Sequence, residues 1–196
     1  MKNQVLTKIN HGLIKMMFNP TVSFEEEIDD KRIILAGNHA SNFDPLILQF
    51  AINRPIHFVC KEELFKSVLR PLMKKVEAIP AKRDGNDINC LKKSISYLEQ
   101  EEVLGIFPEG TFNRSNDLIL PFKLGTIVIA KKSKSDIIPF SITGSYKLYK
   151  NDMKISFGKR IKYNDYSSKE ILEKLENDVK TLILKNRQKS VMIVQK

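Results

Sequence analysis

The sequence predicts a single-domain α/β fold with a mostly parallel or mixed central sheet, covered by helices on both faces. Short apolar runs of strand length alternate with longer segments whose apolar residues recur with a helical period. Strands that alternate with helices form a largely parallel sheet that is buried on both faces. The 196 residues contain no internal repeat, linker or low-complexity tract, so one compact domain is expected.

The first predicted element is an amphipathic helix over residues 5–18. Its apolar residues share one face: Val5, Ile9, Leu13, Met16 and Met17. Its basic residues share another: Lys8, His11 and Lys15. This pattern suits a helix lying in a membrane interface, and equally an N-terminal helix packed on the core. Both interpretations stay open, and Gly12 weakens the helix in either case.

Six apolar runs are predicted to be the strands. They span residues 32–36, 56–60, 78–81, 103–107, 137–142 and 154–161. The runs at 32–36 and 103–107 are continuously apolar, which indicates burial. The last run is expected to be an outer strand.

Helical segments are predicted between these strands. One spans residues 45–52, and a basic amphipathic stretch over residues 61–75 is interrupted at Pro71. Asn86 or Asp87 is expected to cap the next helix. The apolar stripe of that helix is Ile88, Leu91, Ile95 and Leu98.

Two further helices are predicted in the second half of the chain. Pro121 is expected to begin one that runs through Ala130. Ser167 and Glu170 form a capping box for the other, which keeps its helical period to about Lys185.

Charge and cysteine content narrow the functional class. The formal net charge of +10 favours an acidic partner, such as anionic lipid, an acidic carrier protein, a phosphorylated substrate or nucleic acid. No nucleic-acid-binding motif occurs, so nucleic acid is not expected. Cys60 and Cys90 form no disulfide framework, which fits a reduced interior. Neither a membrane-spanning run nor a secretory signal is found, so a soluble or peripheral protein is expected.

The first polar segment of interest, Asn38 to Asp44, directly follows the predicted strand 32–36. Loops at strand ends are where α/β sheets usually place reacting groups. His39 lies five residues before Asp44 and can fold back onto it, so that the carboxylate orients the imidazole toward a substrate hydroxyl. Alternatively, Asp44 and Pro45 are simply a good helix start, with Asp44 as the cap.

The second polar segment, Phe107 to Ser115, follows the predicted strand 103–107. A glycine turn here gathers a carboxylate, hydroxyls and the Arg114 guanidinium, whose planar fork suits a phosphate. A plain polar turn would have a similar composition.

Together, the two segments resemble the 1-acyl-glycerol-3-phosphate acyltransferase family of the glycerolipid acyltransferase superfamily. Residues 38–44 match its His-x4-Asp motif, and residues 107–111 match its Phe-Pro-Glu-Gly-Thr motif. Other family blocks are matched in order between about residues 32 and 145: Lys61 to Leu64, Ala78 to Arg83, Pro121 to Gly125 and Ile138 to Ile142.

The resemblance implies an enzyme that transfers a fatty acyl group from an acyl thioester to the free sn-2 hydroxyl of 1-acyl-glycerol-3-phosphate. The product is phosphatidic acid, an intermediate of phospholipid biosynthesis. The resemblance makes His39 the general base and Asp44 its partner. It also implies a set of substrate-binding residues: Lys61, Arg83, Glu109, Gly110, Thr111 and Arg114.

Two departures from the family pattern concern the acceptor. The family usually has Arg directly after the Thr, where this chain has Phe112, and Glu77 replaces a common Gly. These changes leave His39 and Asp44 intact but leave the acceptor's headgroup open. The alternatives are an acyltransferase for another lysophospholipid or for glycerol-3-phosphate, and a non-catalytic lipid-binding relative.

No cofactor is expected, because a thioester is already an activated acyl donor; acyl-coenzyme A or acyl-acyl carrier protein is the co-substrate. Cys60 offers a competing route through an acyl-cysteine, although it lies in an apolar strand with no base beside it in sequence. No metal site is expected, because the few histidines and cysteines lack ligand spacing.

The expected organisation is a membrane-surface helix over residues 1–24 and an acyltransferase domain over residues 25–196. The expected partners are the lysophospholipid acceptor, the acyl carrier protein or coenzyme A thioester, and an anionic membrane surface. Peripheral attachment at the cytoplasmic face of the cell membrane follows from these expectations. The composition, rich in lysine and isoleucine, hints at a bacterial protein.

Overall fold

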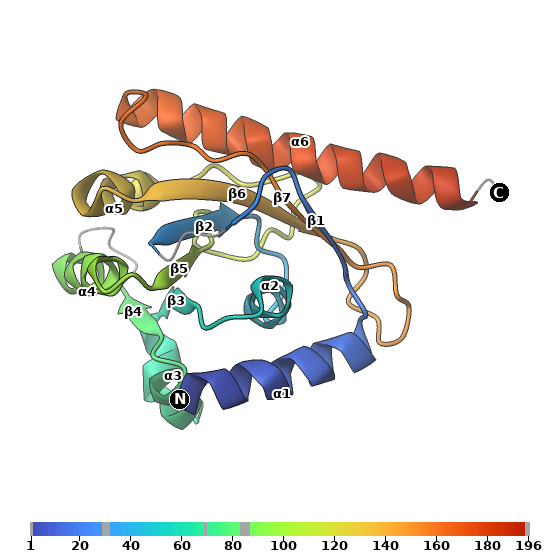
Figure 1. Cartoon of the computed structure of the whole chain (residues 1–196), viewed down its shortest axis with the longest axis horizontal. Helices are drawn as coiled ribbons and strands as arrows, with labels where there is room; N and C mark the ends of the chain where they lie inside the picture. The colour runs from blue at the N-terminus through green and yellow to red at the C-terminus, as the bar shows by residue number, and fades with distance from the viewer. Residues whose placement is uncertain (1, 29–31, 69, 83–86, 195–196) are drawn as a thin grey trace.

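A twisted seven-stranded sheet forms the centre of the protein, with helices on both of its faces (Figure 1). The computed structural model describes residues 2–28, 32–68, 70–82 and 87–194. The strand order is β1-β7-β6-β2-β5-β3-β4. The strands are β1 (Thr21–Phe24), β2 (Ile33–Gly37), β3 (His57–Lys61), β4 (Ile79–Ala81), β5 (Val103–Ile106), β6 (Asp136–Thr143) and β7 (Lys154–Phe157).

The sheet is mixed, as the sequence predicts. Strands β6, β2, β5, β3 and β4 run parallel to one another, so their carboxyl ends share one edge. Strand β7 pairs antiparallel with β6, and β1 pairs parallel with β7. Strand β1 was not predicted from the sequence, because its four residues are mostly exposed and carry no continuous apolar signal.

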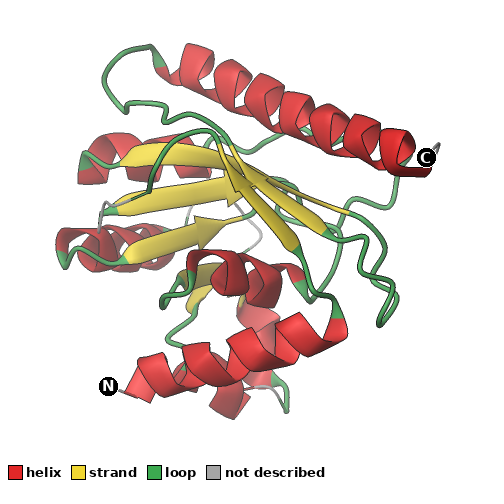
Figure 2. Ribbon diagram, turned by 45° about the vertical axis from the view of Figure 1, so that its right-hand side comes forward, coloured by secondary structure: helices red, strands yellow, loops and turns green. Residues whose placement is uncertain are grey.

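The described helices cover the two faces of the sheet (Figure 2). They are α1 (Lys2–Met17), α2 (Asp44–Ile52), the 3₁₀ helix η1 (Glu62–Lys66), α3 (Arg70–Lys75), α4 (Ile88–Glu99), α5 (Gly125–Ser133) and α6 (Ser168–Val194). None of these helices, over the residues described, is both long and apolar enough to cross a membrane.

Successive side chains of the central strands point to opposite faces of the sheet, so there are two apolar cores, one on each face. In β2, Ile34 and Ala36 face the core formed with α4, α5 and α6. Ile33 and Leu35 face the other core, which is formed with α1 and α2. All of β2 is buried, so its apolar run has partners on both faces of the sheet. The prediction of a sheet covered on both faces is confirmed.

Helix α1 packs on α2 through a face that the sequence pattern did not single out. Ile14 and the following Phe18 are buried, and the Asn10 side chain donates to the Leu46 carbonyl. Most of the described part of the predicted apolar face points away from the core instead: Ile9 is 62% exposed and Met16 is 61% exposed, while Met17 packs against the core. The helix therefore packs on the core and also presents an exposed apolar stripe.

Helix starts follow the capping signals where a side chain supplies the cap. The Asp87 carboxylate accepts hydrogen bonds from the backbone N–H groups of Asn89 and Cys90, while the alternative cap, Asn86, lies outside the described residues. Ser167 and Glu170 form the predicted capping box, with N–H donation in both directions. Helix α6 continues beyond the predicted end at Lys185.

Other predicted boundaries are wrong. The helix expected from Pro121 begins only at Gly125. The first turn forms where the N–H groups of Ile127 and Val128 donate to the Leu124 carbonyl. Before it, the Phe122 N–H donates to the Glu176 carboxylate at 2.7 Å and the Lys123 N–H to the Pro108 carbonyl at 3.0 Å. Pro121 therefore lies in a loop.

The remaining errors are similar in kind. Strand β7 ends at Phe157, and Ile161 forms only an isolated bridge with Ile137. The stretch 61–75 forms η1 and then α3, with Pro71 inside the first turn of α3. Ile88, expected on the apolar stripe of α4, is 64% exposed.

Two glycines, one in β2 and one in α1, provide a matched test of the pairing between β2 and β6. A Cβ on Gly37 would lie 2.2 Å from the Phe140 carbonyl oxygen across the β2–β6 pair, whereas a Cβ on Gly12 of α1 meets nothing within 4 Å. We expect Gly37→Ala to lower the free energy of unfolding by about 1–3 kcal/mol or more, because backbone atoms must move. Gly12→Ala should raise it by about 0.5–1 kcal/mol. Urea denaturation measures both, and a Gly37→Ala protein as stable as wild type would contradict the register.

Candidate active site

Polar groups gather where the parallel strands end. His39 follows β2, Lys61 is the last residue of β3, Phe107 follows β5 and Tyr146 follows β6. The carboxyl ends of these strands lie at one edge of the sheet, where α/β proteins usually bind their ligands. The loop after β2 is fastened to β6 by Asn38, whose side-chain amide donates to the Ile142 carbonyl and accepts from the Ile142 N–H, both at 2.9 Å.

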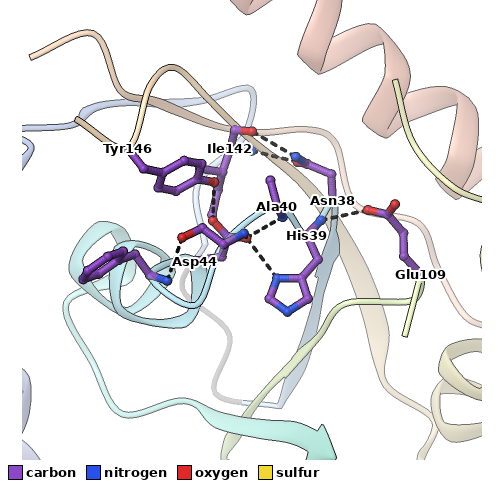
Figure 3. Close-up of polar contacts among 9 residues, drawn as sticks. Asn38, His39, Ala40, Asp44, Glu109, Ile142 and Tyr146 are labelled. Atoms are coloured by element: carbon purple, nitrogen blue, oxygen red, sulfur yellow. Dashed lines mark hydrogen bonds and ion pairs between the residues drawn. The ribbon is translucent and has the colours of Figure 1, made fainter. Parts of the chain in front are cut away.

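Asp44 is the centre of this hydrogen-bond network and is fully buried (Figure 3). Its Oδ2 accepts from the His39 ring at 2.9 Å and from the N–H groups of Ala40 and Ser41 at 2.7 and 2.8 Å. Its Oδ1 accepts from the Tyr146 hydroxyl. Asp44 is the first residue of α2 and not its cap, because Phe43 occupies the cap position. The helix-cap interpretation of Asp44 is therefore wrong.

The contact with Asp44 determines which nitrogen of His39 is available. A carboxylate only accepts hydrogen bonds, so Nδ1 of a neutral His39 carries the proton and Nε2 has a free lone pair. The His39 side chain is 17% exposed, so the ring is partly reachable from solvent. The pair can therefore take a proton from a hydroxyl that reaches Nε2.

Two aromatic rings hold the imidazole in place. Phe107 stacks on His39 with ring centroids 4.0 Å apart and an interplanar angle of 17°. Phe112 contacts the same ring at 4.4 Å with a tilt of 55°. Packing between two rings restricts rotation of the imidazole and adds to the orientation set by Asp44.

Glu109 joins the two polar segments. It is buried, with Oε1 accepting from the His39 N–H and Oε2 from the Leu120 N–H, each at 2.8 Å. Burial raises the pKa of Glu109, while the N–H groups of Leu120 and His39 that donate to its carboxylate act in the opposite direction. The Asn113 N–H also donates to the His39 carbonyl at 2.8 Å. Glu109 therefore fixes the backbone on both sides of the site.

Gly110 allows the second loop to turn sharply. Its φ of +67° lies in the left-handed region, and its N–H donates to the Phe107 carbonyl. The Lys123 side chain crosses this turn, so a Cβ on Gly110 would lie 2.8 Å from the Lys123 ammonium. A side chain at residue 110 would displace that cation.

The structure describes three of the other predicted substrate-binding residues. The Lys61 ammonium lies 6.0 Å from the centre of the Phe112 ring. Thr111 and Arg114 are exposed on the second loop. Arg83 lies outside the described residues.

Sequence analysis missed Tyr146, the positions of Phe107 and Phe112 on His39, and the lysine at residue 123. Tyr146 lies 102 residues from Asp44, so no local spacing connects them. One signal was available: Tyr146 closely follows an apolar strand, and residues after parallel strands converge at one edge.

Cys60 is a poor candidate nucleophile in this structure. Burial, with a smaller contribution from Cys90, raises the pKa of the Cys60 thiol to about 11. The thiol is therefore protonated near neutral pH, and the thiolate is the reactive form.

Several known proteins with similar sequences are named 1-acyl-sn-glycerol-3-phosphate acyltransferases. A probable 1-acyl-sn-glycerol-3-phosphate acyltransferase of Mycoplasma genitalium is 33% identical over 159 residues, which are 78% of this chain and 59% of that protein. The 1-acyl-sn-glycerol-3-phosphate acyltransferase of Bacillus subtilis is 29% identical over 70% of this chain and 71% of its own length. The chain thus matches somewhat more than half of the Mycoplasma protein.

The fold also has a solved counterpart. The crystal structure of the 1-acyl-sn-glycerophosphate acyltransferase PlsC from Thermotoga maritima superimposes with a TM-score of 0.69, over 91% of this chain and 75% of that one, at 21% identity. Residues 19–143, which include both polar loops, match the protein family described as Acyltransferase. The chain belongs to the Acyltransferase family.

Proposed function

We propose that this protein transfers a fatty acyl group from an acyl thioester to the sn-2 hydroxyl of 1-acyl-glycerol-3-phosphate, giving phosphatidic acid. The observation that carries the proposal is a partly exposed His39 ring, oriented through Nδ1 by the fully buried Asp44 carboxylate. Membership of the Acyltransferase family and the names of the similar proteins support the reaction and the acceptor.

In the proposed reaction, Nε2 of His39 removes the proton from the acceptor hydroxyl as its oxygen attacks the thioester carbonyl. A new C–O bond forms and a tetrahedral intermediate results. The C–S bond then breaks, and the leaving thiolate takes the proton from His39. The imidazolium formed between these steps lies against the Asp44 carboxylate, which stabilises its charge. No covalent acyl-enzyme and no cofactor are needed.

The acceptor phosphate is proposed to bind to basic side chains. Lys61 and Arg83 are its first contacts, and Arg114 on the second loop is a further one. Lys123 joins them because its ammonium crosses the Gly110 turn. Glu109, Gly110 and Thr111 are proposed to shape the acceptor site, with Glu109 acting through the backbone that it fixes.

Phe112 motivates a second acceptor class. It follows Thr111, where the family usually has Arg, and its ring contacts His39, so it presents an apolar surface beside the base. Another lysophospholipid or glycerol-3-phosphate is therefore a candidate acceptor.

Helix α1 is proposed to hold the protein on an anionic membrane, at the cytoplasmic face where acyl-coenzyme A or acyl-acyl carrier protein is the donor. Ile9, Leu13 and Met16 form an exposed apolar stripe, and Lys8 and Lys15 are exposed beside it. A helix of this kind lies in the plane of the interface, with its apolar face among the acyl chains. The formal net charge of +10 adds attraction to anionic lipid.

The reaction is tested with purified protein, 1-acyl-glycerol-3-phosphate and each acyl thioester, with phosphatidic acid followed by mass spectrometry. We expect product from wild type and a loss of about 10²–10⁴-fold in His39→Ala, because general-base catalysis is removed. Lys169→Ala, a change to an exposed side chain of α6, is the control and should keep full activity.

The same assay separates the alternatives. Glycerol-3-phosphate and other lysophospholipids are offered as acceptors in parallel, and a preference for one of them would replace the proposed acceptor. Failure of the wild type with every acceptor and both donors would contradict the enzymatic proposal and favour a lipid-binding relative.

Membrane attachment is tested by replacing Ile9, Leu13 and Met16 together with Gln. Binding to anionic vesicles should weaken at least about 10-fold in a flotation assay, because most of the apolar area offered to the membrane is lost. The control replaces exposed apolar residues elsewhere by Gln: Ile88, Leu124 and Leu184. Equal binding by the two triple variants would contradict a role of α1 in membrane attachment.

A further inference from the structure

We propose that Tyr146 is a positioning residue of the active site, which holds the Asp44 carboxylate so that the His39 ring keeps its orientation. The inference rests on the proposed acyl transfer and adds a third member to the pair that the motif contains. Tyr146 reaches the site from the loop after β6, outside both polar segments. Its ring packs against the apolar core on the α1 and α2 side of the sheet, and its hydroxyl donates to Asp44 Oδ1.

The two oxygens of the Asp44 carboxylate are bound very differently. Oδ2 receives three hydrogen bonds, from the His39 ring and from two backbone N–H groups. For Oδ1, the bond that the structure gives among the described residues comes from the Tyr146 hydroxyl (Figure 3). Asp44 is 0% exposed, so water does not reach the carboxylate freely. Loss of the hydroxyl would leave a buried charged oxygen without its donor, which is costly.

Tyr146 is suited to remain a donor. Burial raises its pKa, and the neighbouring Asp44 charge raises it further, so the phenol stays protonated at physiological pH. A protonated phenol beside a carboxylate can only donate to it. The direction of the hydrogen bond is therefore fixed.

The loop that carries Tyr146 is itself fastened at several points. The N–H and hydroxyl of Ser145 both donate to Asp152 Oδ1, at 3.0 and 2.9 Å. Gly144 has a φ of +112° and approaches the Asp152 backbone, which a side chain would prevent. The Tyr149 N–H donates to the Met17 carbonyl at the end of α1. The phenol is therefore presented to Asp44 from a restrained backbone.

These contacts define how Tyr146 acts. It fixes the carboxylate from the side opposite His39, which keeps Oδ2 facing Nδ1 and the imidazole plane unchanged. It acts through Asp44 and need not touch substrate. Removing its hydroxyl should therefore slow turnover without weakening the binding of either substrate.

The test combines Tyr146→Phe with Asp44→Asn in a double-mutant cycle. Tyr146→Phe alone should lower kcat about 10- to 100-fold, as expected for losing a hydrogen bond to a buried charge, with the KM of both substrates within about twofold. In the Asp44→Asn background the same change should cost less than about threefold, because the residues act as a unit. Tyr149→Phe, in the same loop but exposed, is the control and should be fully active.

A second measurement does not depend on acyl transfer. The free energies of unfolding of the four proteins of the cycle should be non-additive, because the hydroxyl and the carboxylate are direct partners. Additive unfolding free energies, an unchanged kcat in Tyr146→Phe, or an effect confined to KM would each overturn the inference. An inactive wild type with non-additive unfolding would contradict the proposed function while leaving the Tyr146–Asp44 contact established.

Discussion

The burial of one carboxylate, Asp44, is the constraint on which the site depends. A charged group without access to water is tolerated only when hydrogen bonds replace its hydration. Here the replacement comes from the His39 ring, two N–H groups of the loop after β2, and Tyr146. The same bonds that satisfy the charge also shape the loop and fix the tautomer of His39. The charge of Asp44 is therefore both a structural requirement and the means of orienting the base.

The sheet makes this arrangement possible by bringing three loops, those after β2, β5 and β6, to one edge. Strand β2 carries the His39 loop and β5 carries the Glu109 loop, and Glu109 links the two through the His39 N–H. Strand β6 delivers Tyr146 from the other side of β2 and is tied to it by Asn38. Helix α2 begins at Asp44 and packs on α1, so the helix with the exposed apolar stripe lies one layer from the site.

Local signals in the sequence were enough to predict the architecture and to locate the two motifs, but they could not predict contacts between segments that are distant in sequence. Apolar runs predicted β2 and β5 because both are buried on two faces, and the short, exposed β1 gave no such signal. The helix expected from Pro121 begins four residues later, at Gly125, and the residues before it are held by distant partners such as Glu176, which accepts from the Phe122 N–H. In the same way, the sequence spacing linked His39 to Asp44. The contacts of Phe107 and Phe112 with the His39 ring, and of the Tyr146 hydroxyl with Asp44, join segments that are distant in sequence, so no local pattern predicted them.

The central claim is that neutral His39 carries its proton on Nδ1 and offers Nε2 to the substrate. ¹⁵N nuclear magnetic resonance of protein labelled at histidine, with His39→Gln used to assign the signals, tests this at alkaline pH, where an imidazole is neutral. We expect His39 to give a pyrrole-type signal from Nδ1 and a pyridine-type signal from Nε2. The reverse assignment, with the proton on Nε2, would mean that Asp44 does not orient the base and would contradict the mechanism.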